Sequence, residues 1–269
     1  MKNNYDKDFF NIINEICYKS KIKIEILSSE FRVLKLIKNN KEYLVYGSDF
    51  GLNDSSSIRL VDNKYATYEI LSNASIPTID THLFDFINSN PSKKDILFEL
   101  EDLFNQYNQL ILKPNKGENG NDVFKISNIN EINNKIEYFI NKNLTFIAQP
   151  FEKIEYEIRV ICINKKAKLY YKKKVINSEL GWKHNLSDNI QIDNFFTKSE
   201  FDKINSIINQ VIQKIPCKNC SIDFIKTYEN EYKVLEINGI PSLTEYSKIS
   251  KQTRNEVENI YYDIISKLF

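Results

Sequence analysis

Residues 221–238 read SIDFIKTYENEYKVLEIN and indicate the class of fold. Two β-type runs, SIDFIKTY and YKVLEI, flank the polar turn ENE, which predicts an antiparallel hairpin. Because side chains alternate along a strand, Glu236 and Asn238 share one face, and strand pairing brings Asp223 opposite that face. Two carboxylates and an amide oxygen suit Mg²⁺ that is bound jointly with phosphates. The alternative is that these carboxylates stand at strand ends and face water.

Helical and β-type periodicities alternate along the rest of the chain. Helices are predicted at residues 5–19, 62–76, 95–108, 130–141, 201–215 and 253–269. Strands are predicted at residues 22–27, 31–37, 42–47, 110–114, 123–126, 145–151, 157–163 and 167–175. Several strands form hairpins, so the pattern predicts an α+β (α/β) fold and argues against a simple parallel array. A polar, turn-rich break, GLNDSSS, marks a boundary at residues 51–57.

Composition narrows the class of protein. The 269 residues have room for one large domain or two smaller ones. Lys and Arg number 37 and Asp and Glu number 36, a net charge of +1, which argues against binding of nucleic acid or anionic membrane through bulk charge. With no stretch of ~20 apolar residues and no signal peptide, a cytoplasmic protein is expected. Cys217 and Cys220 form C-x-x-C and are interpreted as structural thiols.

Two segments carry the cations expected of an anion site. Lys113 lies near the end of the predicted strand 110–114, which is followed by the loop KGENGND at 116–122, whose glycines allow backbone N–H groups to approach phosphate oxygens. The alternative is a simple hairpin turn. Further on, Glu157 and Arg159 share one strand face, and alternation in the lysine run 172–174 points the middle lysine away from its neighbours. With WKHN at 182–185, this cluster can hold phosphate or a carboxylate, or it is a solvated hairpin face.

These segments occur in a recognisable order. DNK at 62–64, which opens a predicted helix with Asp62 as its expected N-cap, precedes LKP and the glycine loop, QPF, E-x-R, the basic strand with WKHN, SIDF and LEIN. Over residues 58–250 this order resembles the ATP-grasp superfamily. Within it the sequence most resembles the branch of ribosomal-protein glutamate ligases, cyanophycin synthetase and the glutathione and D-alanine–D-alanine ligases. The stretch DNKYATYEILSNASIPTID is similar to the family pattern D-K-x-x-T-x-x-x-L-x-x-x-x-I-P.

The resemblance implies an ATP-grasp fold, in which two α+β subdomains enclose ATP. A short N-terminal α/β region is expected at residues 1–57 and the ATP-grasp domain at 58–269. Within that domain, the resemblance implies a mobile lid subdomain at about residues 110–150.

The resemblance also implies the nucleotide-binding residues. They are Lys64, Lys113, Gly117, Gly120, Asn121, Gln149, Pro150, Phe151 and Glu152. The two lysines grip the ATP phosphates, the loop 117–121 closes over them, and residues 149–151 form the hinge beside adenine. Pro150 stands where the family often has an acidic residue, so the ribose contact is assigned to Glu152. Asn121 replaces a loop glycine.

The same resemblance implies the metal ligands and the catalytic residues. The metal, Mg²⁺ with Mn²⁺ as an alternative, is assigned to Asp223, Glu236 and Asn238, and the catalytic residues are Arg159, Lys173 and Asn185. Arg159 matches the arginine that faces the γ-phosphate and the acyl-phosphate. Asn185 matches the asparagine of the family's R-x-N-L segment.

Together these residues predict an ATP-dependent carboxylate–amine ligase that works through an acyl-phosphate and releases ADP and phosphate. The expected partners are a small-molecule or peptide carboxylate and an amine acceptor, with no nucleic acid and no membrane, and family analogy suggests a homodimer. The alternatives are a small-molecule kinase on the same fold and a non-catalytic ATP-binding module. The sequence does not name the carboxylate or the amine.

Overall fold

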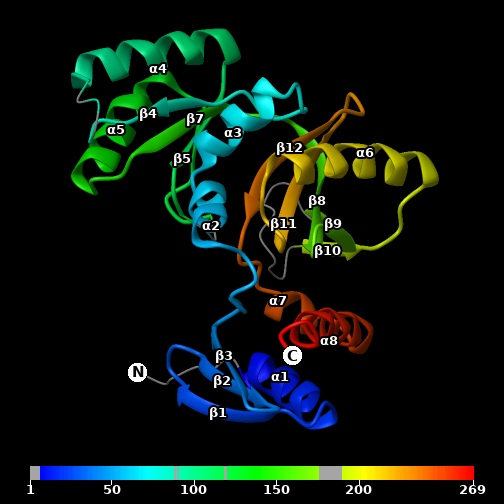
Figure 1. The fold of residues 1–269 in the computed structure, drawn as a ribbon. Helices are drawn as coiled ribbons and strands as arrows, with labels where there is room; N and C mark the ends of the chain where they lie inside the picture. The colour runs from blue at the N-terminus through cyan, green and yellow to red at the C-terminus, as the bar shows by residue number, and fades with distance from the viewer. Residues whose placement is uncertain (1–6, 88, 90, 118–119, 176–189) are drawn as a thin grey trace.

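The computed structural model describes residues 7–87, 89, 91–117, 120–175 and 190–269 (Figure 1). The elements in chain order are α1 (Lys7–Lys19), β1 (Lys23–Ser28), β2 (Val33–Lys38), β3 (Lys41–Tyr46), α2 (Ser55–Asp62), α3 (Lys64–Asn73), β4 (His82–Phe84), α4 (Lys93–Tyr107), β5 (Leu110–Pro114), β6 (Phe124–Ile126), the 3₁₀ turn η1 (Ile129–Glu131), α5 (Ile132–Asn141), β7 (Phe146–Pro150), β8 (Ile154–Ile163), β9 (Lys166–Val175), β10 (Ile190–Asp193), α6 (Lys198–Lys214), β11 (Cys220–Thr227), β12 (Tyr232–Asn238), α7 (Thr244–Ser247) and α8 (Lys251–Ile265). Within these ranges the strands form three sheets, which confirms the predicted α+β class.

The five-stranded sheet, β10-β9-β8-β11-β12, contains the predicted hairpin as β11 and β12. In its register Asp223 pairs with Glu236 on one side and with Arg159 on the other. One face buries apolar side chains such as Ile158 and Phe224 against α6, α2 and α3. On the opposite face the end of β8 that carries Ile161 packs against α7 and α8. The half of that face that carries Arg159 and Asp223 lines a cavity instead.

The four-stranded sheet has the order β4-β7-β5-β6. Its strands alternate, so that Leu110, Leu112 and Ala148 pack against α4 and α5. The residues between them, Ile111 and Gln149, therefore project from the other face, toward the five-stranded sheet. Figure 1 shows this sheet with α4 and α5 on its outer side.

The N-terminal sheet, β1-β2-β3, lies with α1 at the other end of the molecule (Figure 1). Asn39 and Asn40, both with positive φ, form the tight turn between β2 and β3. The buried face of the N-terminal sheet shares one apolar core with α7, α8 and the end of β8. We propose that the chain divides into an N-terminal region, 1–57, and a larger domain, 58–269. Among the described helices, none is both long and apolar enough to cross a bilayer.

The helix predicted at residues 62–76 is wrong at its start, because two helices meet there: Asp62 ends one and Lys64 begins the next. The first, α2, begins in the predicted polar break, where the side chain of Asp54 accepts from the Ser57 N–H. It ends at Asp62, and the N-cap of α3 is Asn63, whose side chain accepts from the Ala66 N–H. The N-cap of α3 is therefore Asn63, one residue after the expected Asp62.

Candidate active site

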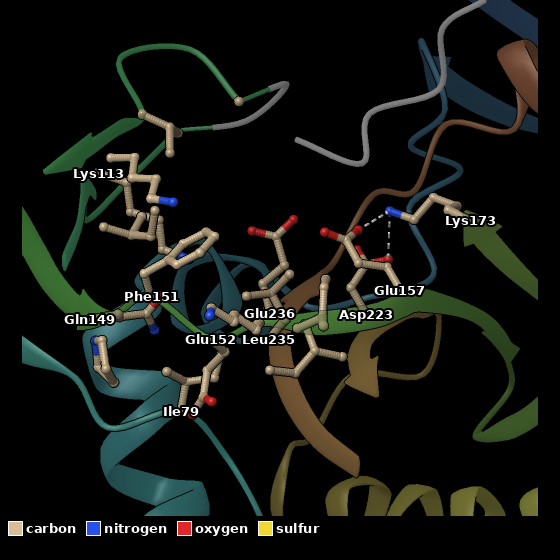
Figure 2. A pocket seen from close by; sticks show the side chains of 18 of the residues that line it. Ile79, Lys113, Gln149, Phe151, Glu152, Glu157, Lys173, Asp223, Leu235 and Glu236 are labelled. Atoms are coloured by element: carbon tan, nitrogen blue, oxygen red, sulfur yellow. Dashed lines mark ion pairs between the residues drawn. The ribbon is translucent and has the colours of Figure 1, made fainter. Parts of the chain in front are cut away.

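A cavity of about 530 Å³ separates the four-stranded sheet from the five-stranded sheet (Figure 2). Its walls come from β5 and β7 on one side and from β8, β9, β11 and β12 on the other. Residues 151–153, between β7 and β8, also line it. Its lining residues are Ile79, Ile111, Lys113, Gly120, Val123, Lys125, Gln149, Pro150, Phe151, Glu152, Lys153, Ile154, Glu155, Glu157, Arg159, Lys173, Val175, Asp223, Ile225, Tyr228, Leu235 and Glu236.

One part of the cavity is apolar. Ile79, Ile111, Val123 and Leu235 line it together with the ring of Phe151. The Lys125 ammonium nitrogen lies 3.5 Å from the centroid of the Phe151 ring, which is a cation–π contact. An apolar space with a few polar groups beside it suits a planar base.

Cations stand where the apolar part ends. Lys113 is buried on β5, and burial lowers the pKa of Lys113 to about 8 although nearby Glu236 raises it. Lys64, at the start of α3, donates from its Nζ to the Gly117 carbonyl at 2.6 Å. Asn115 accepts from the Lys64 N–H through its carbonyl and from the Tyr65 N–H through its side chain. These hydrogen bonds attach the loop after β5 to α3, and Lys64 and Lys113 lie beside that loop.

Asp223 is the centre of an ion-pair network on the opposite wall. Arg159 donates from Nε to Oδ1 and from Nη2 to Oδ2, both at 2.7 Å. The Lys173 ammonium lies 3.7 Å from Asp223 and 2.6 Å from Glu157 Oε2 (Figure 2). Burial raises the pKa of Asp223, but the charges of Arg159 and Lys173 outweigh burial and hold that pKa below its usual value.

The amide of Asn238 links the two carboxylates. Its Nδ2 lies 3.3 Å from Asp223 Oδ2 and 3.3 Å from Glu236 Oε1. A half-turn of the amide exchanges its nitrogen and oxygen, so Asn238 can also turn an oxygen toward the two carboxylates. Among the described residues, no group of three His, Cys, Asp or Glu side chains could hold a metal ion. Two carboxylates and an amide oxygen are hard ligands, and such a set would fit a divalent cation that takes its other ligands from a bound phosphate.

The match to a protein-family model covers residues 70–269 and carries the description "D-ala D-ala ligase C-terminus". The chain belongs to this family. Comparison with curated proteins finds no match. Its fold is the ATP-grasp fold, as its neighbours among solved structures show.

Those neighbours share the fold at low sequence identity. D-alanyl-alanine synthetase A from Vibrio cholerae superposes with a TM-score of 0.71 and 12% identity, over 98% of this chain and 92% of that one. D-alanine–D-alanine ligase from Bacillus anthracis complexed with ATP gives 0.60 and 16%, over 80% and 67%. The ATP-grasp ligase PsnB, complexed with a phosphomimetic variant of its minimal precursor, Mg and ADP, gives 0.58 and 12%, over 81% and 61%.

Most of the residues that the sequence singled out for the ATP-grasp site meet at this cavity. Those that line it are Lys113, Gly120, Gln149, Pro150, Phe151, Glu152, Arg159, Lys173, Asp223 and Glu236. Those that adjoin it are Lys64, Gly117, Asn121 and Asn238. Glu152, the predicted ribose contact, is paired with the Lys233 ammonium at 2.8 Å. Asn185 lies outside the described residues.

Apart from Phe151, the apolar lining of this cavity was missed from the sequence. Ile111 precedes Lys113 by two positions on a predicted strand, so alternation alone places both on one face and was a usable signal. Ile79 and Leu235 carried no such signal, because their role depends on which sheet lies across from them.

Proposed function

We propose that the protein is an ATP-dependent carboxylate–amine ligase. The observation that carries this proposal is the cavity itself, which combines an apolar slot, buried Lys113 on one sheet, and Glu236, Asp223 and Arg159 on the other. A nucleotide that lies in the slot would extend its phosphates past Lys113 toward the carboxylates. Family membership supports the same chemistry.

The residues divide the work of binding. Lys113 and Lys64 supply positive charge to the phosphates, and Phe151, Leu235 and Ile79 enclose the base. Asp223, Glu236 and Asn238 would hold Mg²⁺ or Mn²⁺, which when bound neutralises phosphate charge.

The proposed reaction has two steps. An oxygen of the substrate carboxylate attacks the γ-phosphorus of ATP, the bond between that phosphorus and the bridging oxygen breaks, and ADP leaves. The amine nitrogen then attacks the acyl carbon, phosphate leaves with the bonding electron pair, and the amine loses a proton. Arg159 and Lys173 face the cavity and would stabilise the negative charge of the phosphoryl group in transfer. Holding both reactants in one enclosed space supplies the rest of the rate enhancement.

The test is ADP release from ATP and Mg²⁺ with pooled carboxylates, amino acids and short peptides, each with and without an amine. ADP that depends on both a carboxylate and an amine, and that is abolished in Asp223→Asn, supports the proposal. Mass spectrometry of the active pool then identifies the new amide. A stable phosphorylated product with no amine requirement would indicate a kinase. ATP binding without ADP from any pool would contradict catalysis.

A further inference from the structure

Residues 77–82 connect the two sheets that enclose the cavity. At one end, the Val234 N–H of β12 donates to the Pro77 carbonyl at 2.8 Å, and the Thr78 hydroxyl donates to the Val234 carbonyl at 3.0 Å. At the other end, His82 begins β4, which pairs with β7. This connecting segment is therefore fixed to an edge strand of each sheet.

Asp80 stands in the middle of the connecting segment, accepts three hydrogen bonds and lies beside the ring of His82. Oδ1 accepts from the Tyr68 hydroxyl at 2.8 Å and from the Thr81 N–H at 3.0 Å. Oδ2 accepts from the Tyr107 hydroxyl at 2.8 Å and lies 3.2 Å from His82 Nε2. Burial raises the pKa of Asp80, but the hydrogen bonds from the two tyrosines outweigh it and lower that pKa. The carboxylate is therefore ionised at neutral pH, which strengthens these bonds.

The two tyrosines belong to different structural units. Tyr68 lies on α3, whose Leu71 is buried in the core beneath the five-stranded sheet. Tyr107 ends α4, whose Leu103 is buried in the core beneath the four-stranded sheet, and Tyr107 itself packs against that core. One carboxylate thus joins a helix of one unit to a helix of the other. We call Tyr68, Asp80 and Tyr107 the hinge clasp.

The hinge clasp adjoins the cavity through both neighbours of Asp80. Ile79 lines the cavity directly. Thr81 is buried, and its Oγ1 accepts from Gln149 Nε2 at 2.9 Å, while Gln149 lines the cavity from β7. A shift of Asp80 would therefore move a residue on each side of the base-sized slot.

We propose that Asp80 is a positioning residue, which with Tyr68 and Tyr107 sets the separation of the two sheets and so the width of the nucleotide slot. For the identity of the ligand, this inference rests on the proposed function. The part that Asp80 plays in holding the connecting segment does not depend on it. None of the three side chains lines the cavity, so the clasp acts through Ile79 and Gln149.

The experiment uses the full chain and removes one hydroxyl at a time. Tyr107→Phe and Tyr68→Phe each cut the link to one unit and keep the ring that packs. Tyr170→Phe is the matched control, because its hydroxyl donates to Asn205 Oδ1 at 2.6 Å within the five-stranded unit alone. Amide hydrogen exchange of the free protein is measured at the connecting segment and at Val234, together with calorimetric binding of ADP in the presence of Mg²⁺.

Each clasp variant is expected to speed exchange at the connecting segment and to weaken ADP binding about three- to tenfold, as loss of a charge-assisted hydrogen bond allows. Exchange in β11 is expected to stay unchanged. The double variant is expected to be little weaker than either single one, since either loss already separates the units. In turnover assays the KM for ATP rises while kcat at saturating ATP stays within about twofold.

Exchange and ADP affinity that match the Tyr170→Phe control in both clasp variants would overturn the inference. Fully additive effects in the double variant would do the same, because they would show two independent bonds. If the unaltered protein binds no ADP, the proposed nucleotide site fails. Exchange at the connecting segment still decides whether the hinge clasp holds that segment in place.

Discussion

Two neighbouring lysines on β9 point to opposite faces of the five-stranded sheet. Each is buried and each forms an ion pair: Lys172 lies 3.0 Å from Glu200 Oε1, and Lys173 lies 2.6 Å from Glu157 Oε2. The side chains of both lysines are 6% exposed. By residue type, burial and pairing they are nearly equivalent, so these properties alone do not separate a structural group from a functional one.

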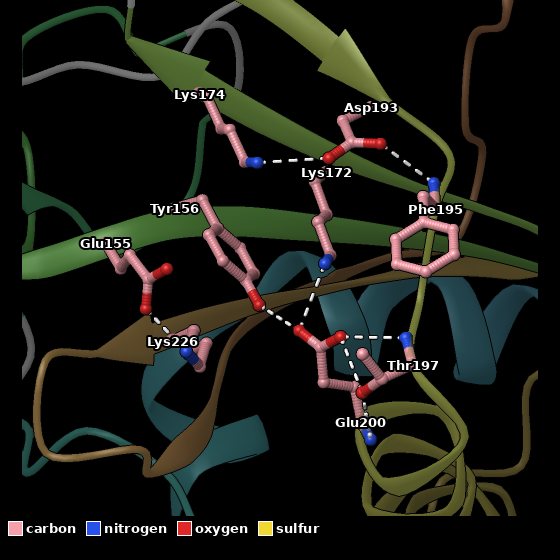
Figure 3. Close-up of polar contacts among 9 residues, drawn as sticks. All are labelled: Glu155, Tyr156, Lys172, Lys174, Asp193, Phe195, Thr197, Glu200 and Lys226. Carbon is pink, nitrogen blue, oxygen red and sulfur yellow. Dashed lines mark hydrogen bonds and ion pairs between the residues drawn. The ribbon is translucent and has the colours of Figure 1, made fainter.

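Their surroundings do separate them. On the Lys172 face, Glu200 also accepts from the Tyr156 hydroxyl and from the N–H of Thr197, the residue that caps the start of α6 (Figure 3). The Lys172 ammonium lies 4.7 Å from the centroid of the Tyr156 ring. Helix α6 and this ring therefore enclose the pair of Lys172 and Glu200. On the Lys173 face the same kind of pair borders the cavity. A buried ion pair indicates a functional site only where open space adjoins it.

The largest expected effect separates the two faces by activity. Glu236→Gln removes a charge from the cavity and is expected to lower turnover on the order of 10²-fold or more, as loss of an electrostatic group at a transition state does. Glu200→Gln makes the same chemical change on the closed face and is expected to leave turnover within about twofold. Steady-state ADP release measures both. Equal losses in the two variants would contradict the distinction.

A second prediction concerns the pH dependence of the cavity face. Burial lowers the pKa of Lys113 to about 8, so the free enzyme loses this cation as the pH rises above 8. Because kcat/KM reports ionisation of the free enzyme, kcat/KM for ATP should fall above that pH, approaching about tenfold per pH unit.

Lys113→Arg sharpens this test, since a guanidinium keeps its charge in this range. The variant is expected to lose the fall near pH 8 even if its maximal rate is lower. A fall of the same shape in the variant would assign the ionisation to another group.

The smallest effect on activity is expected on the closed face, which carries Lys172 and Glu200. There we expect a change in stability instead. Burial opposes ionisation of Glu200, but hydrogen bonds from Tyr156, Thr197 and Lys172 outweigh it and lower the pKa of Glu200 from 4.5 to about 2. A carboxyl group with a lowered folded-state pKa stabilises the fold fully above pH 4.5, and this stabilisation is lost as the pH falls toward 2.

Glu200→Gln should therefore lower the free energy of unfolding at neutral pH by about 1–2 kcal/mol. It should also flatten the loss of stability on acidification, because the titrating group is gone. Urea unfolding of both proteins at neutral pH and at about pH 3 measures this. A variant whose stability falls with acid as steeply as that of the unaltered protein would contradict it.

The sequence predicted the elements whose pattern is local. Alternation in residues 221–238 predicted the hairpin, and pairing brought Asp223 opposite Glu236 as expected. The short strands β4 and β10 were not predicted, and they form because β7 and β9 offer them an edge.

Other features depend on contacts between distant parts of the chain. Asp62 and Asn63 are both competent helix caps, and the Asn115 bonds to the N–H groups of Lys64 and Tyr65 favour a start at residue 64. The same holds for Ile79 and Leu235, which became recognisable as cavity residues only with both sheets in place. Sequence reasoning thus found the charged groups of the site better than its apolar walls.

The core shared by α1 and α8 has a consequence for biosynthesis. Phe9 on α1 and Tyr261 on α8 stack edge to face with ring centroids 5.8 Å apart, although one belongs to the first described element and the other to the last. On the ribosome, α1 emerges long before its partner. The apolar face of α1 and the N-terminal sheet must therefore wait, exposed or held by a chaperone, until α8 is synthesised. This end of the molecule therefore completes its core only after α8 is synthesised.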